Sequence, residues 1–414
     1  MKILFVNALY EPNVRGGAER AIQNLAEALA SAGAETVVAS TVGAGKGSER
    51  NIRGVKVVYL PIANLHWPYD RVPRSSARRK LWHLADIYNL AMKVRLRRLM
   101  RDESPDIVHT SNLQGISVSA WRAASAERIP VLHTLQDYYL TCGRCTRYHN
   151  GRTCERTCWD CLPLLIARRR ASACVSAVVG ISRYILCHHR EHGFFSAAKF
   201  SDVIAHDSPT VAAPAPVRPA GRPLTFGYFG RIVPEKGIER LIDAFNQSHG
   251  EGSRLLIAGE GEGRYQRDLR GRQSEGDNRD AIEFLGWIAP AEFFRQVDVL
   301  VLPSLWHEPL ARVIVEANAH GVPVIGSARG GIPEGIEDGV TGLLFEPDEP
   351  GALPAAIDRL MREPSLVDKL GENARRRARD YAADRVVAKY LNAYSRVLAL
   401  QAAGERLVTG PSER

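Results

Sequence analysis

The feature that most constrains the fold is an alternation of short apolar runs with segments of helical periodicity. In the first half of the chain, these runs are rich in Val and Ile and suit strands of a parallel sheet that is buried on both faces. The predicted strands span residues 2–9, 36–40, 55–60, 106–110, 130–135 and 177–181. Between the first two, Ala18 to Ala32 has helical spacing, and Gly33 stands where a helix C-cap is expected. This order predicts a βαβ unit.

The same alternation restarts after a Pro-rich segment, residues 208–222, which has few large apolar side chains and is predicted to be a linker. The later predicted strands span residues 224–230, 254–259, 281–285, 297–303, 322–327 and 342–345. A chain of 414 residues is too long for one compact core, so we expect two Rossmann-like, doubly wound α/β domains. The predicted domains are residues 1–207 and 223–381, and a C-terminal helix and tail, 382–414, is expected to pack back on the first domain.

Composition excludes several classes of protein. A hydrophobic fraction of 45% and a charged fraction of 24% do not fit a disordered, collagenous or coiled-coil chain. The apolar runs are shorter than the roughly 20 residues that cross a bilayer. Glu11 and Arg15 interrupt the N-terminal run before a secretory signal is complete. We therefore expect a folded cytoplasmic protein.

The formal net charge of +9 favours anionic partners. Between Arg71 and Arg101, cations alternate with large apolar residues, which predicts one or two amphipathic helices with a basic face. Such helices can lie on the anionic inner face of the cell membrane, or they can be solvated while their apolar side packs on the domain. The stretch lacks a recognition-helix pattern, so no nucleic-acid partner is predicted.

Loops that follow strands bind ligands in doubly wound folds. Gly16 and Gly17 follow the first strand, where they either bring helix amides close to a diphosphate or form an ordinary turn. Gly230, Arg231 and Lys236 occupy the corresponding loop of the second domain. There an Arg fork and a Lys charge can neutralise two phosphates without a metal, unless both are merely solvated cations.

A third loop combines two carboxylates. Pro309 suits the first turn of a helix, which would place Glu308 at the junction of loop and helix and Glu316 two turns along. Glu308 can then accept hydrogen bonds from a hexose and Glu316 from a ribose. A role with the helix dipole alone explains Glu308 but not Glu316, which needs partners if it is buried. The Gly-rich turn 326–334 either approaches the same ligand or is a plain connection.

Taken together, these residues resemble the retaining, nucleotide-sugar-dependent GT-B glycosyltransferases of family 4, also called glycosyl transferases group 1. The resemblance covers nearly the whole chain. Its strongest part is the pair Glu308 and Glu316 with seven residues between them. The other matching motifs, in the family's order, are Gly16-Gly17, Gly230-Arg231, Lys236-Gly237, Gly259-Glu260-Gly261 and Phe284-Leu285-Gly286.

The resemblance implies two domains that face each other across a cleft and a hexosyltransferase that requires no cofactor for catalysis. The donor would be a UDP- or GDP-linked sugar, and the acceptor a glycan or lipid-linked saccharide of cell-surface polysaccharide biosynthesis. Arg231, Lys236 and Glu308 would be catalytic, because the reaction needs stabilisation of charge on the leaving diphosphate. The implied donor-binding residues are Gly16, Gly17, Gly230, Arg231, Lys236, Gly286, Glu308, Pro309, Leu310, Ala311 and Glu316. A non-catalytic nucleotide-sugar-binding scaffold is the alternative, and the intact acidic pair argues against it.

Two positions depart from the family pattern. Ala311 stands where Gly is common, which narrows the sugar pocket by a methyl group. Gln136, before Asp137, stands where many members carry His. Gln136 does not titrate, although it can still hydrogen-bond a sugar. We place Gln136 and Asp137 on the acceptor side.

Five of the 7 cysteines fall in a predicted insertion at about residues 138–163. They are Cys142, Cys145, Cys154, Cys158 and Cys161. Two C-x-x-C pairs, Cys142 with Cys145 and Cys158 with Cys161, have the spacing of zinc ligands, and a structural zinc would order the insertion. An iron–sulfur centre and unliganded thiols are the alternatives, and Cys154 or His149 can replace one ligand. The insertion is expected to border the acceptor side of the cleft.

Overall fold

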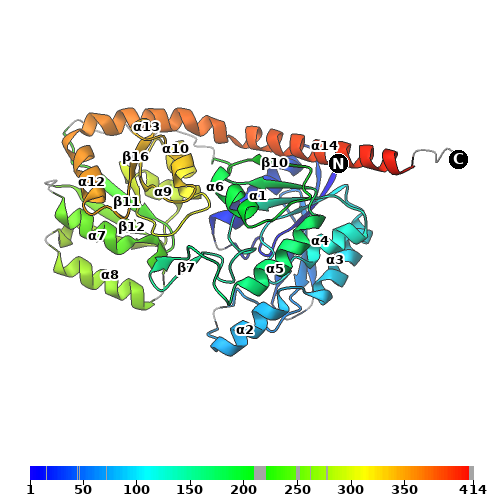
Figure 1. The fold of residues 1–414 in the computed structure, drawn as a ribbon. Coiled ribbons are helices and arrows are strands. Elements are labelled where there is room, and N and C mark those ends of the chain that lie inside the picture. The colour runs from blue at the N-terminus through cyan, green and yellow to red at the C-terminus, as the bar shows by residue number, and fades with distance from the viewer. Residues whose placement is uncertain are drawn as a thin grey trace. The chain divides into compact units, whose positions relative to one another are not determined.

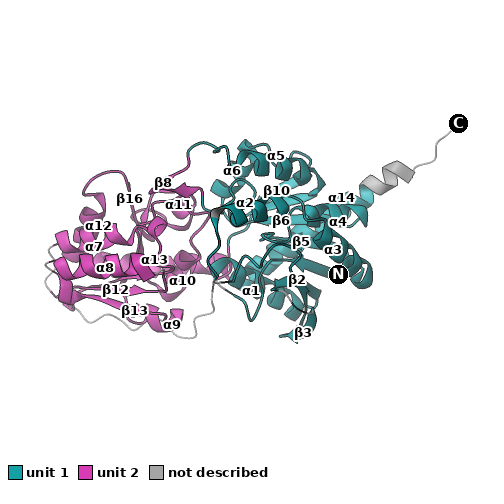
Figure 2. Cartoon of the chain, turned by 90° about the horizontal axis from the view of Figure 1, so that it is seen from below, with its two compact units in different colours: residues 1–146, 155–205, 383–414 teal, residues 147–154, 206–382 magenta. Residues whose placement is uncertain are grey.

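The computed structural model describes residues 1–414 except 15, 44, 46, 71, 209–220, 249–251, 262, 277 and 410–414. The chain forms two compact units (Figures 1 and 2). Unit 1 comprises residues 1–146, 155–205 and 383–414, and unit 2 comprises residues 147–154 and 206–382. Each unit is built on one largely parallel sheet, which confirms the predicted class of two Rossmann-like α/β domains. No helix among the described residues is long and apolar enough to cross a membrane.

Unit 1 contains an eight-stranded sheet in the order β10-β9-β6-β5-β1-β2-β4-β3. Its strands are β1 (Lys2–Val6), β2 (Glu35–Val42), β3 (Ser48–Ile52), β4 (Val55–Pro61), β5 (Ile107–Thr110), β6 (Val131–Leu135), β9 (Ala177–Gly180) and β10 (Phe200–Val203). All neighbours pair in parallel except β3 and β4. The six predicted strands are confirmed. The edge strands β3 and β10 were not predicted, because neither contains a buried apolar run.

The helices of unit 1 are α1 (Gly17–Ser31), α2 (Ser76–Ala85), α3 (Leu90–Glu103), α4 (Ser119–Ala126), α5 (Leu162–Ala171), α6 (Arg183–Glu191) and α14 (Ala383–Thr409). Helix α1 buries Ile22 and Leu29 in the core of the sheet, which stabilises the fold by roughly 1.5–3 kcal/mol for each side chain. Its C-cap is Ala32, one residue before the predicted Gly33, and Gly33 follows with a φ of +89° and an amide that donates to the carbonyl of Ala30. Helix α14 adds Tyr390 and Tyr394 to the same core.

Unit 2 contains a six-stranded, wholly parallel sheet in the order β13-β12-β11-β14-β15-β16. Its strands are β11 (Thr225–Phe229), β12 (Arg254–Ala258), β13 (Ile282–Gly286), β14 (Val299–Leu302), β15 (Val324–Ser327) and β16 (Gly342–Phe345). Its helices are α7 (Ile238–Gln247), α8 (Gly263–Glu275), α9 (Pro290–Phe294), α10 (Arg312–His320), α11 (Ile332–Gly335), α12 (Ala352–Arg362) and α13 (Pro364–Ala378). All six predicted strands are present, and the five other than β13 are largely buried.

A short hairpin from the Cys-rich insertion belongs to unit 2, which corrects the predicted first domain of residues 1–207. The hairpin consists of β7 (Tyr148–His149) and β8 (Arg152–Thr153). Its hydroxyl at Thr153 donates to the carbonyl of Leu305 at 3.2 Å, and Arg329 donates to that hydroxyl at 3.3 Å. The sequence did not predict this placement, because the contacts are polar and no run of apolar residues marks them. Most of the predicted linker, 209–220, lies outside the described residues.

Candidate active site

The strand order of unit 2 reverses between the neighbouring strands β11 and β14. Ligands bind at the carboxyl ends of parallel strands where the order reverses. Lys236 ends a short 3-10 helix, Pro234–Lys236, that follows β11, and Glu308 lies in the loop that follows β14. The Nζ atom of Lys236 lies 2.5 Å from Oε1 of Glu308, and Oγ of Ser304 donates to the same oxygen at 2.7 Å. Two predicted site residues therefore form one ion pair.

The Lys236–Glu308 pair is largely removed from water. The Glu308 side chain is 6% exposed and that of Lys236 is 17% exposed. Burial works to raise the pKa of the Glu308 carboxyl, but the Lys236 ammonium and hydrogen bonds from Lys236, Ser304 and Trp306 hold that pKa below its ordinary value. The Lys236 ammonium also lies 5.6 Å from the centre of the Trp306 ring. The site thus holds a carboxylate and a cation at close range.

The two loops that carry this pair are joined through their backbones. The amide of Leu305 donates to the carbonyl of Glu235 at 2.9 Å. Gly237 has a φ of +68°, and a Cβ atom there would stand only 2.3 Å from the carbonyl oxygen of Pro303. Glycine is required here because a side chain would force the loops apart. The Lys236-Gly237 sequence therefore sets the approach of Lys236 to Glu308.

The Gly-rich turn 326–334 holds the backbone of Glu308. The amide of Gly331 donates to the carbonyl of Glu308 at 2.6 Å. Gly330 has a φ of +61°, and a Cβ atom there would lie 2.3 Å from the same carbonyl oxygen. The turn is therefore packed against the backbone of Glu308, and its approach to a donor stays a prediction.

The predicted start of the following helix is wrong. Helix α10 begins at Arg312 with Ala311 as its N-cap, so Pro309 lies outside the helix. The reason is that the carbonyl of Glu308 accepts a hydrogen bond from the amide of Gly331, so it does not form the first hydrogen bond of a helix. Glu316 consequently lies one turn into α10, not two turns after Glu308.

The segment between Glu308 and α10 brings backbone donors to the site. The side chains of Leu310 and Ala311 are buried. Within the part of the chain that the structure describes, the amides of these two residues donate to no backbone carbonyl. Amides at the start of a helix suit a negatively charged or hydroxyl-bearing ligand. Their predicted role in holding a donor sugar stays a prediction.

Glu316 is paired with Arg312, as a largely buried carboxylate requires. Arg312 Nε lies 2.9 Å from Glu316 Oε1, and Arg312 Nη1 lies 3.0 Å from Asp207 Oδ1. Burial works to lower the pKa of the Arg312 guanidinium, but the two carboxylates raise it overall. Asp207 was not predicted, because it precedes the linker and follows no sequence motif.

Arg231, Gly230 and Gly286 lie at the same edge of the sheet of unit 2. The Arg231 side chain is 57% exposed, and its Nη2 is 3.7 Å from Oε1 of Glu235. Gly230 follows β11, and Gly286 ends β13, where its carbonyl accepts from the amide of Gly259 at 2.8 Å. Arg231 is therefore accessible to a ligand.

The structure adds Arg329 and the hairpin residue Thr153 to this region. Both donate hydrogen bonds to the carbonyl of Leu305, Arg329 at 2.9 Å and Thr153 at 3.2 Å. Arg329 also forms an ion pair with Asp348. The position of Arg329 between the strand β15 and the glycines was a usable signal, whereas nothing in the sequence singles out Thr153.

The other predicted residues belong to unit 1. Gly16 is the N-cap of α1, after β1, and the buried Glu19 lies in the first turn of that helix. Gln136 follows β6 and is 6% exposed, and its side-chain oxygen and nitrogen have no hydrogen-bond partner among the described residues. Burial raises the pKa of Asp137 to about 6, and the charge of Glu19 adds to the shift. Gln136 thus offers both a donor and an acceptor to a ligand.

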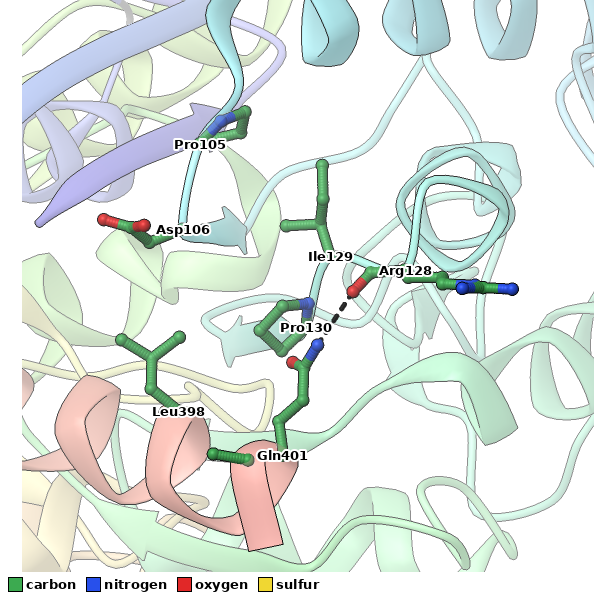
Figure 3. Close-up of a pocket in the computed structure, with 8 residues that line it drawn as sticks. Pro105, Asp106, Arg128, Ile129, Pro130, Leu398 and Gln401 are labelled. Atoms are coloured by element: carbon green, nitrogen blue, oxygen red, sulfur yellow. Dashed lines mark hydrogen bonds between the residues drawn. The ribbon is translucent and has the colours of Figure 1, made fainter. Parts of the chain in front are cut away.

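Figure 3 shows a cavity of unit 1 whose lining includes none of the predicted site residues. It is lined by Asp106, Pro130 and Leu398, among others, and Gln401 donates to the carbonyl of Arg128 at its edge. Asp106 and Pro130 directly precede β5 and β6, so this cavity lies at the amino ends of the strands. Ligands of doubly wound folds bind at the opposite ends.

The cysteines of the predicted zinc site form two tight turns in unit 1. The amide of Cys145 donates to the carbonyl of Cys142 at 3.2 Å, and that of Cys161 to Cys158 at 3.0 Å. A hydrogen bond with the Cys142 thiol, burial and a hydrogen bond with Cys158 raise the pKa of the Cys161 thiol. Among the described residues, no group of three or more His, Cys, Asp or Glu side chains is arranged to hold a metal ion. The zinc site stays a prediction.

Most of each unit matches a family of known proteins. Residues 16–201 match the family described as "Glycosyl transferase 4-like domain", and residues 213–377 match "Glycosyl transferases group 1". The chain is 32% identical over 341 residues to an uncharacterized 42.6 kDa protein in the cps region of Klebsiella pneumoniae, a match that covers 81% of this chain and 87% of that protein.

Two solved structures resemble the whole chain. Sucrose-phosphate synthase from Thermosynechococcus elongatus is 21% identical with a TM-score of 0.75, over 96% of this chain and 99% of that chain. HepE from Anabaena, in complex with UDP-glucose, is 20% identical with a TM-score of 0.70, over 95% of this chain and 99% of that chain. These likenesses show the same two-domain fold.

Proposed function

The chain belongs to the group 1 glycosyl transferases, and we propose that it moves a sugar from a nucleotide diphosphate to a saccharide or lipid-linked acceptor with retention of anomeric configuration. Its fold is that of the GT-B glycosyltransferases. The complex of HepE with UDP-glucose supports UDP rather than GDP as the nucleotide. The relative from a cps region supports a polysaccharide product.

The observation that carries the proposal is the Lys236–Glu308 pair beside the amides of Leu310 and Ala311. A bound diphosphate would draw the Lys236 ammonium toward its phosphate oxygens, because two phosphates carry more charge than one carboxylate. Glu308 would then accept hydrogen bonds from the sugar hydroxyls. The exposed Arg231 would close on the same diphosphate, and together these charges would stabilise the leaving group.

The proposed reaction needs no protein base. The bond between the anomeric carbon and the leaving phosphate oxygen breaks, and the acceptor oxygen bonds to that carbon on the same face. The acceptor proton passes to the leaving phosphate oxygen, so atoms and charge balance. In this scheme Glu316 binds the ribose, the Gly286 region binds the base, and Gly16 and Gly17 approach the diphosphate. Gln136 and Asp137 contribute on the acceptor side.

A donor screen tests this function. Purified protein is incubated with UDP- and GDP-linked hexoses, and the thermal shift and the release of free nucleotide are measured with and without saccharide acceptors. We expect one donor to stabilise the protein and to be consumed, and nuclear magnetic resonance of the product to show the anomeric configuration of the donor. A donor that binds but is never consumed would favour the non-catalytic scaffold, and an inverted product would refute retention.

Lys236→Ala provides the internal control for the screen. It removes the cation of the pair and should lower turnover strongly. Arg264→Ala removes an exposed cation from helix α8 of the same unit and should leave turnover unchanged. Equal activity of the Lys236→Ala protein and the wild type would contradict the assignment.

A further inference from the structure

Three helices of unit 1 present large apolar side chains to solvent. Half of the large apolar residues that are exposed in the described chain belong to this region. They are Leu81 and Leu84 of α2, Leu90 and Val94 of α3, and Trp159, Leu162 and Ile166 in and before α5. Their exposed fractions run from 36% for Ile166 to 89% for Trp159. We call these seven residues the apolar face.

The apolar face follows from the spacing along each helix. Leu81 and Leu84 are three residues apart, and Leu90 and Val94 are four apart, so each pair shares one side of its helix. The opposite side of α2 is the anchored one, because Trp82 is buried and its indole donates to the carbonyl of His66 at 2.9 Å. Packing of this amphipathic stretch on the domain therefore accounts for only one side of α2.

Helices α2 and α5 lie beside each other in both views of the molecule (Figures 1 and 2). Lys80 of α2 forms an ion pair of 3.6 Å with Asp160, the neighbour of Trp159. At the other end, Arg168 of α5 lies 3.5 Å from Asp86, which follows α2 directly. These contacts hold α2 and α5 close to each other, and α3 follows α2 after a connection of only four residues, 86–89.

Cations surround the apolar face. Helices α2 and α5 contain no carboxylate. Their exposed cations are Arg78, Arg79, Lys80, Arg169 and Arg170, and α3 adds Arg95, Arg98 and Arg101. Three of these cations have acidic partners: Lys80 is paired with Asp160, Arg98 with Asp102 and Arg101 with Glu127. The surface combines exposed hydrocarbon with an excess of positive charge.

We propose that the apolar face docks unit 1 on an anionic lipid bilayer. Leucine and tryptophan side chains would enter the boundary between headgroups and acyl chains, while the cations would meet lipid phosphates. A second copy of the chain is a poorer partner, because a symmetric contact would set the same cations against each other. A free acidic polysaccharide would leave the leucines in water. The inference rests on unit 1 alone and does not depend on the proposed donor or acceptor.

Flotation with vesicles tests the proposal on the full chain. We expect the protein to float with vesicles of phosphatidylglycerol and phosphatidylcholine, to stay at the bottom with phosphatidylcholine alone, and to float less as salt rises. Leu81→Asp with Leu84→Asp should lower partitioning about tenfold or more, because two apolar side chains are lost and two negative charges are added. Leu400→Asp, at an exposed position of α14 in the same unit, is the matched control and should change partitioning less than about twofold.

A charge reversal separates the contribution of the cations. Arg78→Glu with Arg79→Glu should lower partitioning about tenfold or more, and Arg264→Glu with Arg267→Glu makes the same change in net charge on α8. Circular dichroism and donor consumption should be unchanged in all four proteins, which keeps folding and the proposed function separate from lipid binding. Failure of the wild type to float with the anionic vesicles would overturn the proposal. So would a dimer that Leu81→Asp with Leu84→Asp converts to a monomer, since the face would then join two copies.

Discussion

Replacement of Glu308 by Gln tests whether the Lys236–Glu308 pair acts through its charge. The glutamine keeps the shape of the side chain, and its oxygen can still accept from Lys236 Nζ and Ser304 Oγ, which lie 2.5 and 2.7 Å from the carboxylate oxygen. Hydrogen bonds to charged groups contribute about 1.5–3 kcal/mol, against about 0.5–1.5 kcal/mol for neutral ones. The pair is mostly buried, so we expect Glu308→Gln to lower the free energy of unfolding by about 1–2 kcal/mol at pH 7.

The pH dependence gives this prediction its sharpest form. The pKa of Glu308 in the folded protein is below the ordinary value of 4.5. The charge of Glu308 therefore stabilises the fold fully above that ordinary value, and this contribution is lost as the pH falls through the lower, folded pKa. The difference between wild type and variant should be largest at pH 7 and should shrink in acid below the ordinary pKa.

Urea denaturation at a series of pH values, without ligand, measures this difference. Glu292→Gln is the matched control, because Glu292 is an exposed carboxylate of the same unit, in α9. It should change the free energy of unfolding by less than about 0.5 kcal/mol at any pH. A difference between wild type and Glu308→Gln that is the same at pH 7 and in acid would refute the reasoning.

Three further predictions concern other parts of the chain. Burial raises the pKa of Asp137 from 3.8 to about 6, so the free energy of unfolding of the wild type should fall as the pH rises through this range. Above pH 6, Asp137→Asn should therefore be more stable than the wild type by up to about 3 kcal/mol in urea denaturation. If the carboxyl were solvated, this gain in stability would not appear. Gly330→Ala should weaken donor binding and lower the melting temperature more than Gly339→Ala does. Both residues have positive φ, but a Cβ atom at Gly330 would clash with the backbone of Glu308, whereas one at Gly339 would meet no atom. Equal melting temperatures of the two variants would contradict this. Elemental analysis should find stoichiometric zinc in the wild type and in the control Cys187→Ser. The double variant Cys142→Ser with Cys161→Ser should contain no zinc, and a wild type without zinc would contradict the prediction.

The fold was predictable because its signal is local. The central parallel strands are buried on both faces and therefore appear as continuous apolar runs, as in β14, whose four residues are all buried. The edge strand β3 gives no such signal, because its residues are exposed or half-buried. The end of α1 just before Gly33 was readable for the same local reason, since only a residue that tolerates positive φ suits that position.

The candidate site was predictable where charged side chains stand in loops that follow strands. Lys236 and Glu308 each follow a strand, and the reversal of strand order brings those two loops together. The start of α10 was predicted wrongly, because the bond from Gly331 to the Glu308 carbonyl is a long-range contact that Pro309 does not reveal. Asp207 and Thr153 were missed for a similar reason, since their partners Arg312 and Leu305 are more than a hundred residues away.

The placement of residues 147–154 has a consequence for exchanging parts between relatives. Because this hairpin and residues 206–382 form one unit, the polypeptide passes from one unit to the other at 146/147, 154/155, 205/206 and 382/383. A chimaera spliced only at the linker would pair residues 206–382 of one parent with a hairpin from the other, and the contact of Thr153 with Leu305 would then join two unmatched sequences. Grafts that change sugar preference should therefore carry the hairpin together with the larger segment.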